Sequence, residues 1–452
     1  MKSSSTAVRK SRVEVTSAGE AGVMVQASPR LLLASQLIFN VGFFSVVPFL
    51  AVAMREDFGM GAMAIGIVLG ARTFAQQGLF LFGGAIADVW GARRAMITGC
   101  LVRIAGYLLL VLAEDFPLFL LGAVITGVGG ALFSPALESL VAAAAQRGTT
   151  RSKTTPNSTT KSNQGSALFA LLVVFGEIGA VVGPLLGALL LNTSFDTALL
   201  VGAGVFALMA LVFLRFLPKT RPDIPETLAE QPRSAPSSGI WSCLGEKRFI
   251  WFAAFYSLNL LAYNQLYFGL PVELQRSGAG ISALATVFAC ASVLTVVLQW
   301  PIARLMRRAG AKIALPLGFG LQAAGFGSLA VMAVFPPPNG FPILPALLLV
   351  TGLSLGHMCV TPVAMGLVLE FSAGRPTGAF YGLLSSAGGV AVLLGNTALA
   401  PLYELAYAPS LAAAAPWLLM TLLAAISAAA INRFLPKAKA KAQGPQELLH
   451  TA

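Results

Sequence analysis

The sequence has 452 residues, of which 56% are hydrophobic and only 11% are charged. A soluble globular domain carries roughly 25% charged residues, so this chain has too few charged groups to cover a water-facing surface. Its formal net charge of +12 is interpreted as loop charge that sets orientation in a membrane, not as a nucleic-acid-binding surface. Composition therefore predicts an all-α membrane protein, and it excludes a nucleic-acid-binding module, a disordered chain and a disulfide-rich domain.

Twelve apolar segments are each long enough to cross a hydrocarbon core of ~30 Å as a helix. They form two six-helix bundles, residues 31–216 and 249–435, between tails at 1–30 and 436–452. The Pro-rich segment 217–248 reads as a linker between the bundles, and the Ser/Thr/Lys-rich segment 146–165 as a flexible loop. The predicted helices are 31–54, 63–87, 95–112, 117–143, 166–191, 197–216, 249–270, 282–303, 313–335, 343–369, 378–402 and 412–434.

Basic residues are concentrated in every second loop between the predicted helices. All of the 30 Lys and Arg residues fall on the side of the termini and the central linker, except Arg55, Arg72, Arg103 and Arg276. Because positive residues favour the cytoplasmic side, we expect both termini and the linker in the cytoplasm and the protein in a bacterial inner (plasma) membrane. An odd number of crossings would break this alternation, so the charge pattern supports the count of twelve.

Two loops at equivalent places in the halves are similar in sequence. Residues 85–94 read AIADVWGARR, and residues 301–312 read PIARLMRRAGAK, which matches the first loop after a three-residue insertion. An internal repeat of this kind is typical of transporters whose two halves enclose a site near the middle of the membrane and expose it to each side in turn.

The first of these loops, with Gly84, Asp88, Gly91, Arg93 and Arg94, resembles the signature loop of the major facilitator superfamily. Val89 departs from the pattern, since the family usually has Arg or Lys there. The resemblance implies a fold of two pseudo-symmetric six-helix bundles. It also implies that this loop is a conformational latch against the eleventh helix.

The predicted fifth helix contains the run GEIGAVVGPLLG at residues 176–187. Its glycines share one helix face and permit close packing on a neighbour, and Pro184 removes a backbone hydrogen bond and can bend the helix. The run resembles the fifth-helix signature of the twelve-span drug:proton antiporters, which assigns Gly179, Gly183, Pro184 and Gly187 to antiport. Ordinary small-residue packing is the alternative interpretation.

Three charged residues lie deep inside the apolar segments. A charge at mid-membrane costs at least ~2.5–3.5 kcal/mol and calls for a partner or a wet cavity. Glu177 is the candidate proton carrier, and Arg72 and Arg103 are its candidate charge partners. A static ion pair without a transport role is the competing hypothesis.

Polar and aromatic side chains form stripes on several predicted helices. The superfamily resemblance implies that helices 1, 4, 7 and 10 line the cavity, so the stripes predict an amphipathic binding surface; hydrogen bonding between helices would place them equally well. The candidate cavity residues are Gln36, Asn40, Phe43, Gln76, Phe133, Tyr256, Asn259, Tyr263, Tyr267, His357 and Thr361.

The resemblance implies a secondary transporter that exports amphipathic small molecules, including drugs, in exchange for protons. An exporter dedicated to one metabolite, such as a siderophore or an antibiotic, and an importer of a polar nutrient stay open as alternatives. The sequence has no nucleotide-binding, HExxH, zinc-spacing or GxSxG motif, so we expect no enzymatic activity, cofactor or metal. The expected partners are the substrate, protons and the lipid bilayer but no nucleic acid, and the expected state is a monomer.

Overall fold

The computed structural model describes residues 28–151, 163–217, 243–335, 341–372, 377–407 and 410–436. Within these ranges the chain is helical and contains no strand. Eleven of the described helical runs are long and apolar enough to cross a membrane. The predictions made for most of the two tails and of the central linker fall outside the described residues.

The first half of the chain forms eight α-helices and one π-helical turn. The π-helical turn, η1, interrupts the second membrane run. The elements are α1 (Pro29–Phe44), α2 (Val47–Glu56), α3 (Ala62–Thr73), η1 (Phe74–Gly78), α4 (Phe80–Trp90), α5 (Ala92–Val111), α6 (Phe116–Arg151), α7 (Asn163–Leu191) and α8 (Phe195–Phe216).

The second half follows the same plan. Its last membrane run begins and ends in short 3-10 turns, η4 and η5. The elements are α10 (Lys247–Asn264), α11 (Gly269–Ser277), α12 (Ile281–Ala309), α13 (Ala311–Val334), α14 (Leu344–Ser372), α15 (Thr377–Ala406), η4 (Leu411–Ala414), α16 (Ala415–Ala430) and η5 (Ile431–Phe434).

The first and seventh predicted helices are broken, where the sequence predicted continuous ones. The breaks separate α1 from α2 and α10 from α11, and each second piece begins with a proline in its first turn, Pro48 or Pro271. Proline has no N–H to continue the ladder and clashes with the preceding turn. Neither α10 nor α11 is among the eleven long apolar runs, so the count of twelve crossings stays a prediction.

The predicted flexible loop at 146–165 is shorter than expected at both ends. Helix α6 continues to Arg151 and α7 already begins at Asn163. The run Ala142–Ala145 at the end of the apolar segment explains the extension of α6, because alanine is the strongest helix former. Apolar length also underestimates α12, which continues to Ala309 because residues 304–309, RLMRRA, are strong helix formers although several are charged.

Equivalent residues in the two halves make equivalent contacts between helices. Gly99 on α5 lies against the backbone of Gly129 on α6, and Gly318 on α13 lies in the same way against Gly356 on α14. Both third helices also begin after a glycine of positive φ, 86° at Gly91 and 79° at Gly310. The spacing from Gly91 to Gly99 equals that from Gly310 to Gly318. The internal repeat is therefore visible in packing as well as in sequence.

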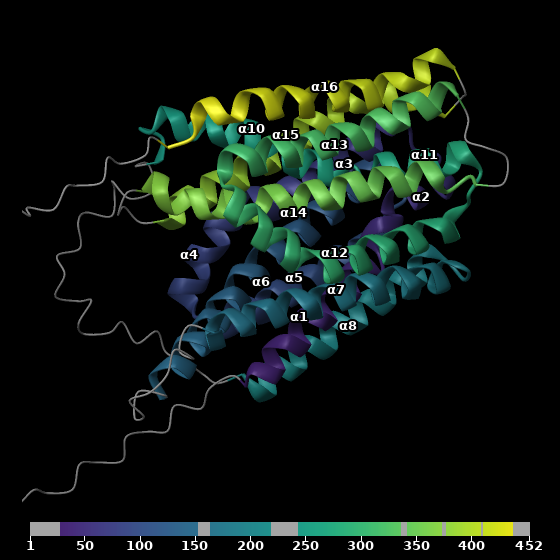
Figure 1. Ribbon diagram of the computed structural model, residues 1–452. Coiled ribbons are helices and arrows are strands. Elements are labelled where there is room, and N and C mark those ends of the chain that lie inside the picture. Colours follow the sequence, from purple (N-terminus) through teal and green to yellow (C-terminus); the bar gives the residue numbers. More distant parts are fainter. Residues whose placement is uncertain are drawn as a thin grey trace, which may run out of the picture.

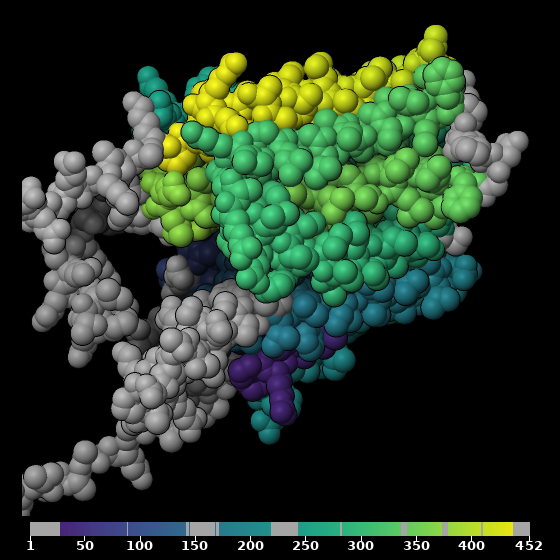
Figure 2. All heavy atoms as spheres, viewed as in Figure 1, coloured from purple at the N-terminus to yellow at the C-terminus, as the bar shows by residue number. Residues whose placement is uncertain are grey.

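The helices run side by side, with those of residues 29–216 mainly below those of residues 247–434 in Figure 1. The halves meet where α3 and η1 pack on α15 and where α7 packs on α12. The start of α1 and the end of α16 lie at the same end of the molecule, on the left of Figure 1. Figure 2 shows α12, α13 and α14 as a continuous surface of the second half, with α7 of the first half directly below it.

Candidate functional site

Two arginines lie at the centre of the first half, almost without solvent contact. Arg72 on α3 is 4% exposed and Arg103 on α5 is 1% exposed. The Arg72 guanidinium donates from Nη2 to Gln76 Oε1 at 2.9 Å. Both guanidinium groups face the ring of Phe43, at 4.7 Å from Arg72 and 5.5 Å from Arg103. Cation–π contact therefore stabilises part of this buried positive charge.

Glycines on α6 make the space that these arginines occupy. A Cβ at Gly130 would lie 2.5 Å from Arg103 Nη2 and 3.0 Å from the Gln76 amide carbon. A Cβ at Gly127 would clash with the backbone oxygen of Arg72. The two arginines thus pack closely against the glycine face of α6.

An aromatic wall closes the other side of Arg103. Its guanidinium lies 4.5 Å from the ring centre of Phe39 and 5.1 Å from that of Phe206. Phe133, a predicted cavity residue, stacks on Phe39 with ring centres 4.2 Å apart. Phe133 is therefore buried behind Phe39 and supports this aromatic wall by packing.

Glu177 does not pair with either arginine, although the sequence suggested that it would. No ion pair among the described residues joins Glu177 to Arg72 or Arg103. Its carboxyl instead lies beside the hydroxyl of Ser292 on α12, across the interface between the halves. It also interacts electrostatically with Tyr263 and Tyr267. The carboxyl and the two guanidinium groups are thus not joined by an ion pair in this conformation, and their joint role in proton coupling stays a prediction.

Tyr267 connects the two charged regions. Its phenol lies near both Arg72 and Glu177, and its ring stacks on that of Phe288, with ring centres 5.7 Å apart. The interface of the two halves therefore holds one group of residues, called the centre below, which comprises Arg72, Arg103, Tyr267 and Glu177 with the rings around them.

Amide and imidazole groups form a neutral cluster in the second half. Gln322 Nε2 donates to Asn259 Oδ1 at 2.7 Å, and Asn259 Nδ2 lies 3.2 Å from His357 Nδ1 and 3.3 Å from Thr361 Oγ1. The His357 ring packs on Tyr263 at 4.5 Å. The cluster joins α10, α13 and α14, and it brings the predicted stripes of the seventh and tenth helices together.

Tyr256 lies beside the same cluster, next to Thr361 and Asn259. Gln322 was not predicted as a site residue, although a usable signal exists. The repeat that pairs Gly99 with Gly318 also pairs Arg103 with Gln322.

A second buried network, also missed by sequence reasoning, crosses the interface between the halves. Asn264 Nδ2 donates to Thr73 Oγ1 at 3.1 Å, and Asn396 Nδ2 donates to Asn264 Oδ1 at 3.0 Å. Gln265 continues it, donating to Asn396 Oδ1 and accepting from the Tyr403 hydroxyl. Asn264 and Gln265, which connect the network, lie at the break between α10 and α11, which periodicity alone did not reveal.

The glycine face of α7 packs directly on α1. A Cβ at Gly179 would lie 2.6 Å from Asn40 Cβ, and one at Gly183 would lie 2.6 Å from Phe44 Cβ. Gly187 approaches the backbone oxygen of Ser45 in the same way, and Pro184 is accommodated within an unbroken α7. This geometry agrees equally with an antiport role and with simple helix packing.

Gln36 and Asn40 lie on this α1–α7 contact. Asn40 Nδ2 donates to the backbone oxygen of Gly176 at 2.8 Å, and Gln36 Nε2 donates to Asn40 Oδ1 at 3.4 Å. Their amides are therefore engaged in holding the helices together in this conformation.

The signature loop connects α4 to α5 through Gly91. Arg93 donates from Nη2 to the backbone oxygen of Leu214 at 2.6 Å and from Nε to that of Phe213. It thereby caps the end of α8, where the last carbonyls of a helix lack the partners of an ordinary turn; the Phe213 oxygen also accepts the backbone N–H of Leu217. Gly84 has no atom within 3.8 Å of its would-be Cβ, Arg94 is exposed, and the side chain of Asp88 lies outside the described ones. The predicted latch contact with the eleventh helix therefore stays a prediction.

At the end away from the termini, an ion pair joins the halves. Arg55 Nη1 lies 3.0 Å from Glu404 Oε1, and the same carboxylate accepts the backbone N–H of Ala62. The Arg55 guanidinium also lies 3.8 Å above the ring of Tyr407. Burial raises the pKa of Tyr407 to about 12, so the ring faces the cation as a neutral phenol.

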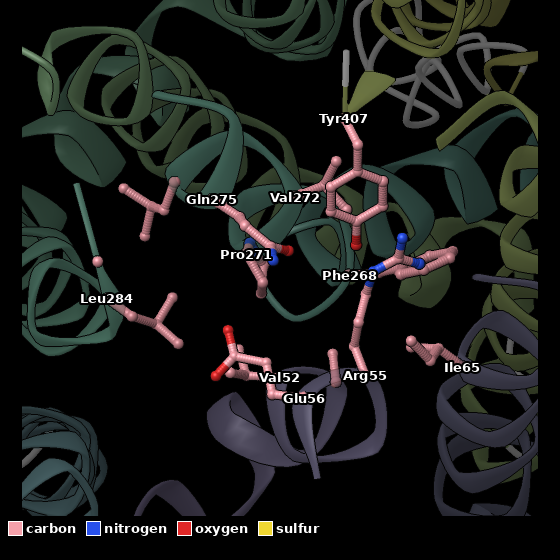
Figure 3. A pocket seen from close by; sticks show the side chains of 13 residues that line it. Val52, Arg55, Glu56, Ile65, Phe268, Pro271, Val272, Gln275, Leu284 and Tyr407 are labelled. Atoms are coloured by element: carbon pink, nitrogen blue, oxygen red, sulfur yellow. The ribbon is translucent and has the colours of Figure 1, made fainter. Parts of the chain in front are cut away.

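A hollow of about 570 Å³, partly open to the outside, lies beside this ion pair between α2, α11 and α12. Figure 3 shows Arg55 reaching towards Tyr407, while Glu56 points into the space between Leu284 and Pro271. The hollow lies next to the inter-half contact and apart from the arginine centre.

The comparisons agree with this architecture. The Major Facilitator Superfamily model matches residues 32–396. The chain belongs to the major facilitator superfamily. It is therefore a membrane transporter, in agreement with the relatives and solved structures described next.

Among its superfamily relatives is the uncharacterized MFS-type transporter Rv0849 of Mycobacterium tuberculosis. The two are 31% identical over 386 residues, which cover 83% of this chain and 86% of that protein. Multidrug resistance protein MdtH of Photorhabdus laumondii is 27% identical over 404 residues, covering 89% and 93%.

Solved superfamily structures share the fold at low sequence identity. The nucleoside transporter NupG has a TM-score of 0.67 at 14% identity, covering 90% of this chain and 98% of its own. A POT family transporter in complex with 5-aminolevulinic acid has a TM-score of 0.69 at 15% identity, covering 90% and 96%. These likenesses bear on the fold alone.

Proposed function

We propose that this superfamily member is a proton-coupled exporter of amphipathic small molecules that works by alternating access. The observation that carries the proposal is a carboxyl, that of Glu177, in contact with Ser292 across the interface between the halves. A proton on a group at this interface changes the contacts between the halves, and movement of the halves relative to one another is what exposes the centre to each side.

The surroundings of Glu177 support a protonatable role. No basic side chain among the described residues forms an ion pair with it. An unpaired carboxylate at membrane depth is costly, and protonation removes that cost. Binding and release of the proton can therefore be tied to closing and opening of the α7–α12 contact.

The proposed substrate class is supported by the residues that line the centre and by the description of one relative. The centre combines aromatic rings, such as those of Phe43, Tyr263 and Tyr267, with a few polar groups, as expected for amphipathic ligands. MdtH, similar over most of both chains, is described as a multidrug resistance protein. Multidrug export is the corresponding proposal here.

We further propose twelve crossings, with α10 and α11 together forming the seventh, and both termini in the cytoplasm. The start of α1 and the end of α16 lie at one end of the molecule, as an even number of crossings requires. The basic loops favour the cytoplasm for that end. The Arg55–Glu404 pair then closes the periplasmic end.

The test uses everted membrane vesicles, whose lumen is acidified by respiration and whose pH gradient is followed by a quenched fluorescent amine. We expect an exported amphipathic dye to release lumenal protons and restore fluorescence, compared with vesicles that lack the protein. Glu177→Gln cannot carry the proton and should reduce this rate at least about tenfold, while dye exchange without a gradient continues.

Glu370→Gln is the matched control, because Glu370 is an exposed carboxyl near the end of α14 and should leave the response unchanged. A full response from Glu177→Gln would contradict the carrier assignment. A response to one metabolite and to no dye would favour the dedicated exporter over the multidrug exporter.

A further inference from the structure

The two central arginines leave hydrogen-bond donors without partners. Arg72 Nε, Arg103 Nε and Arg103 Nη2 are buried, and none of these atoms has an acceptor among the residues that the structure describes. Arginine stays protonated in proteins and carries five donors in a fixed fork. Two full positive charges thus lie at mid-membrane depth, and each has donors to spare.

Nearby protein groups do not supply the missing negative charge. Arg72 and Arg103 repel one another electrostatically, and the described ion pairs lie elsewhere, at Arg55–Glu404 and Arg276–Glu273. Rings such as that of Phe43 offset part of the cost, but a ring face satisfies few N–H groups in the guanidinium plane.

The second half shows that the fold does not require a cation at this place. Gln322 occupies the position equivalent to Arg103 in the repeat, is fully buried, and bonds to Asn259. A neutral amide therefore fills the equivalent space. The positive charge of the first half is a property of this site and not of the helix packing.

From these observations we propose that the Arg72–Arg103 pair is a subsite for the carboxylate of an amphipathic organic anion. The unpaired N–H groups match the two oxygens of a carboxylate. Phe39, Phe43 and Phe206, the rings beside the guanidinium groups, would pack on the apolar body of the ligand. This inference deepens the proposed function, because it names the substrate class of the same centre.

The arrangement also explains how such a ligand could communicate with the proton site. Tyr267 interacts with both Arg72 and Glu177, so an anion at the arginines changes the electrostatic potential at Glu177.

The test measures binding to the purified full-length protein in lipid nanodiscs, without any gradient, by ligand-induced change in melting temperature. The probes are 1-naphthaleneacetate and its neutral isostere 1-naphthaleneacetamide, with sodium acetate as the anion without an apolar body. We expect naphthaleneacetate to stabilise the wild type and to bind at least about tenfold more tightly than either other probe.

Arg72→Gln and Arg103→Gln should each weaken naphthaleneacetate about 10- to 100-fold and leave the amide unaffected. Arg72→Lys, which keeps the charge but loses the fork, should fall between wild type and Arg72→Gln. Arg307→Gln, at an exposed position of α12, is the matched control and should bind as the wild type does.

The melting temperature without ligand separates a binding role from a structural one. A ligand site that carries an unpaired buried charge should not lose stability when Arg72 becomes Gln. If Arg72→Gln lowered the melting temperature without ligand by as much as naphthaleneacetate raises that of the wild type, the proposal would be overturned. So would equal binding of acid and amide, unchanged binding to both Gln variants, or sodium acetate binding as tightly as naphthaleneacetate.

Failure of proton-coupled export is distinguishable from failure of this subsite. Glu177→Gln should keep arginine-dependent binding of naphthaleneacetate, because binding needs no gradient. Arginine-dependent binding in a protein that does not move protons would support the anion subsite and reject the coupling. Proton-driven dye export by a protein that does not discriminate acid from amide would reject the subsite alone.

Discussion

Neighbouring glycines on α4 have different physical roles, although the sequence shows them as a simple pair. A Cβ at Gly83 would clash with the backbone oxygen of Ala131 on α6, whereas one at Gly84 would meet nothing closer than Pro135 at 3.8 Å. Only Gly83 is therefore needed for the close approach of α4 and α6. Gly84, which belongs to the superfamily signature, is free of that constraint.

We therefore expect Gly83→Ala to destabilise the protein by about 1–3 kcal/mol, because a backbone oxygen cannot move aside as a flexible side chain can. Gly84→Ala is the adjacent control and should be neutral or stabilising by up to ~1 kcal/mol, since alanine is the better helix former. Thermal unfolding followed by tryptophan fluorescence in detergent micelles measures both. Equal losses at the two positions would contradict this difference in packing between the two glycines.

The sequence was sufficient to single out Arg72, Arg103 and Glu177, because ionised side chains are rare within apolar segments. It could not say what each one contacts. Arg103 faces aromatic rings from α1 and α8, and Glu177 reaches α12. Such partners depend on how helices far apart in the chain are rotated against each other, which helical periodicity does not determine.

At the scale of elements, the third and ninth helices begin at glycines that no other residue replaces easily. Gly91 has φ 86° and ψ 142°, and Gly310 has φ 79° and ψ 166°. This region of backbone conformation is nearly confined to glycine. The signature loop and its copy thus share a backbone requirement, even though Arg304 stands in place of Asp88.

Gly310→Ala should destabilise the protein by about 1–3 kcal/mol through backbone strain alone, since nothing lies within 4 Å of the would-be Cβ. Gly320→Ala, on the same helix with similarly open space and ordinary helical φ, is the control and should not lower stability. The same unfolding measurement compares them. A tolerated Gly310→Ala would show that the connection between α12 and α13 can relax into another turn.

The positions of the long helices were largely predictable, because length and hydropathy determine which segments cross a membrane. Interruptions within them were not. Proline at the start of α2 and α11 and the π-helical turn at Phe74–Gly78 divide runs that look continuous in composition. Each interruption lies near the centre or the inter-half network, where backbone irregularity places polar groups that a regular helix would not.

At the scale of the whole molecule, an ion pair joins the two halves at the end away from the termini. Arg55 and Glu404 are separated by 349 residues in sequence yet share a hydrogen bond of 3.0 Å. Both are partly exposed, and a pair of this kind is worth only about 0–1 kcal/mol. A weak contact suits a closure that must open during each transport cycle.

Alternating exposure of the centre can be measured through distances between spin labels on the two halves. One pair, at Met63 and Leu405, spans the halves at the ion-pair end, and another, at Val89 and Glu370, spans them at the end of the termini; all four positions are exposed. Labelling requires replacement of the exposed Cys290, and pulsed electron resonance is recorded across pH with and without an exported substrate.

We expect opposite changes at the two ends. Conditions that lengthen the Met63–Leu405 distance should shorten the Val89–Glu370 distance, and Glu177→Gln should remove the dependence on pH while the substrate response persists. Distances that lengthen together, or that stay fixed at both ends while transport proceeds, would contradict a transporter whose halves rock about a central site.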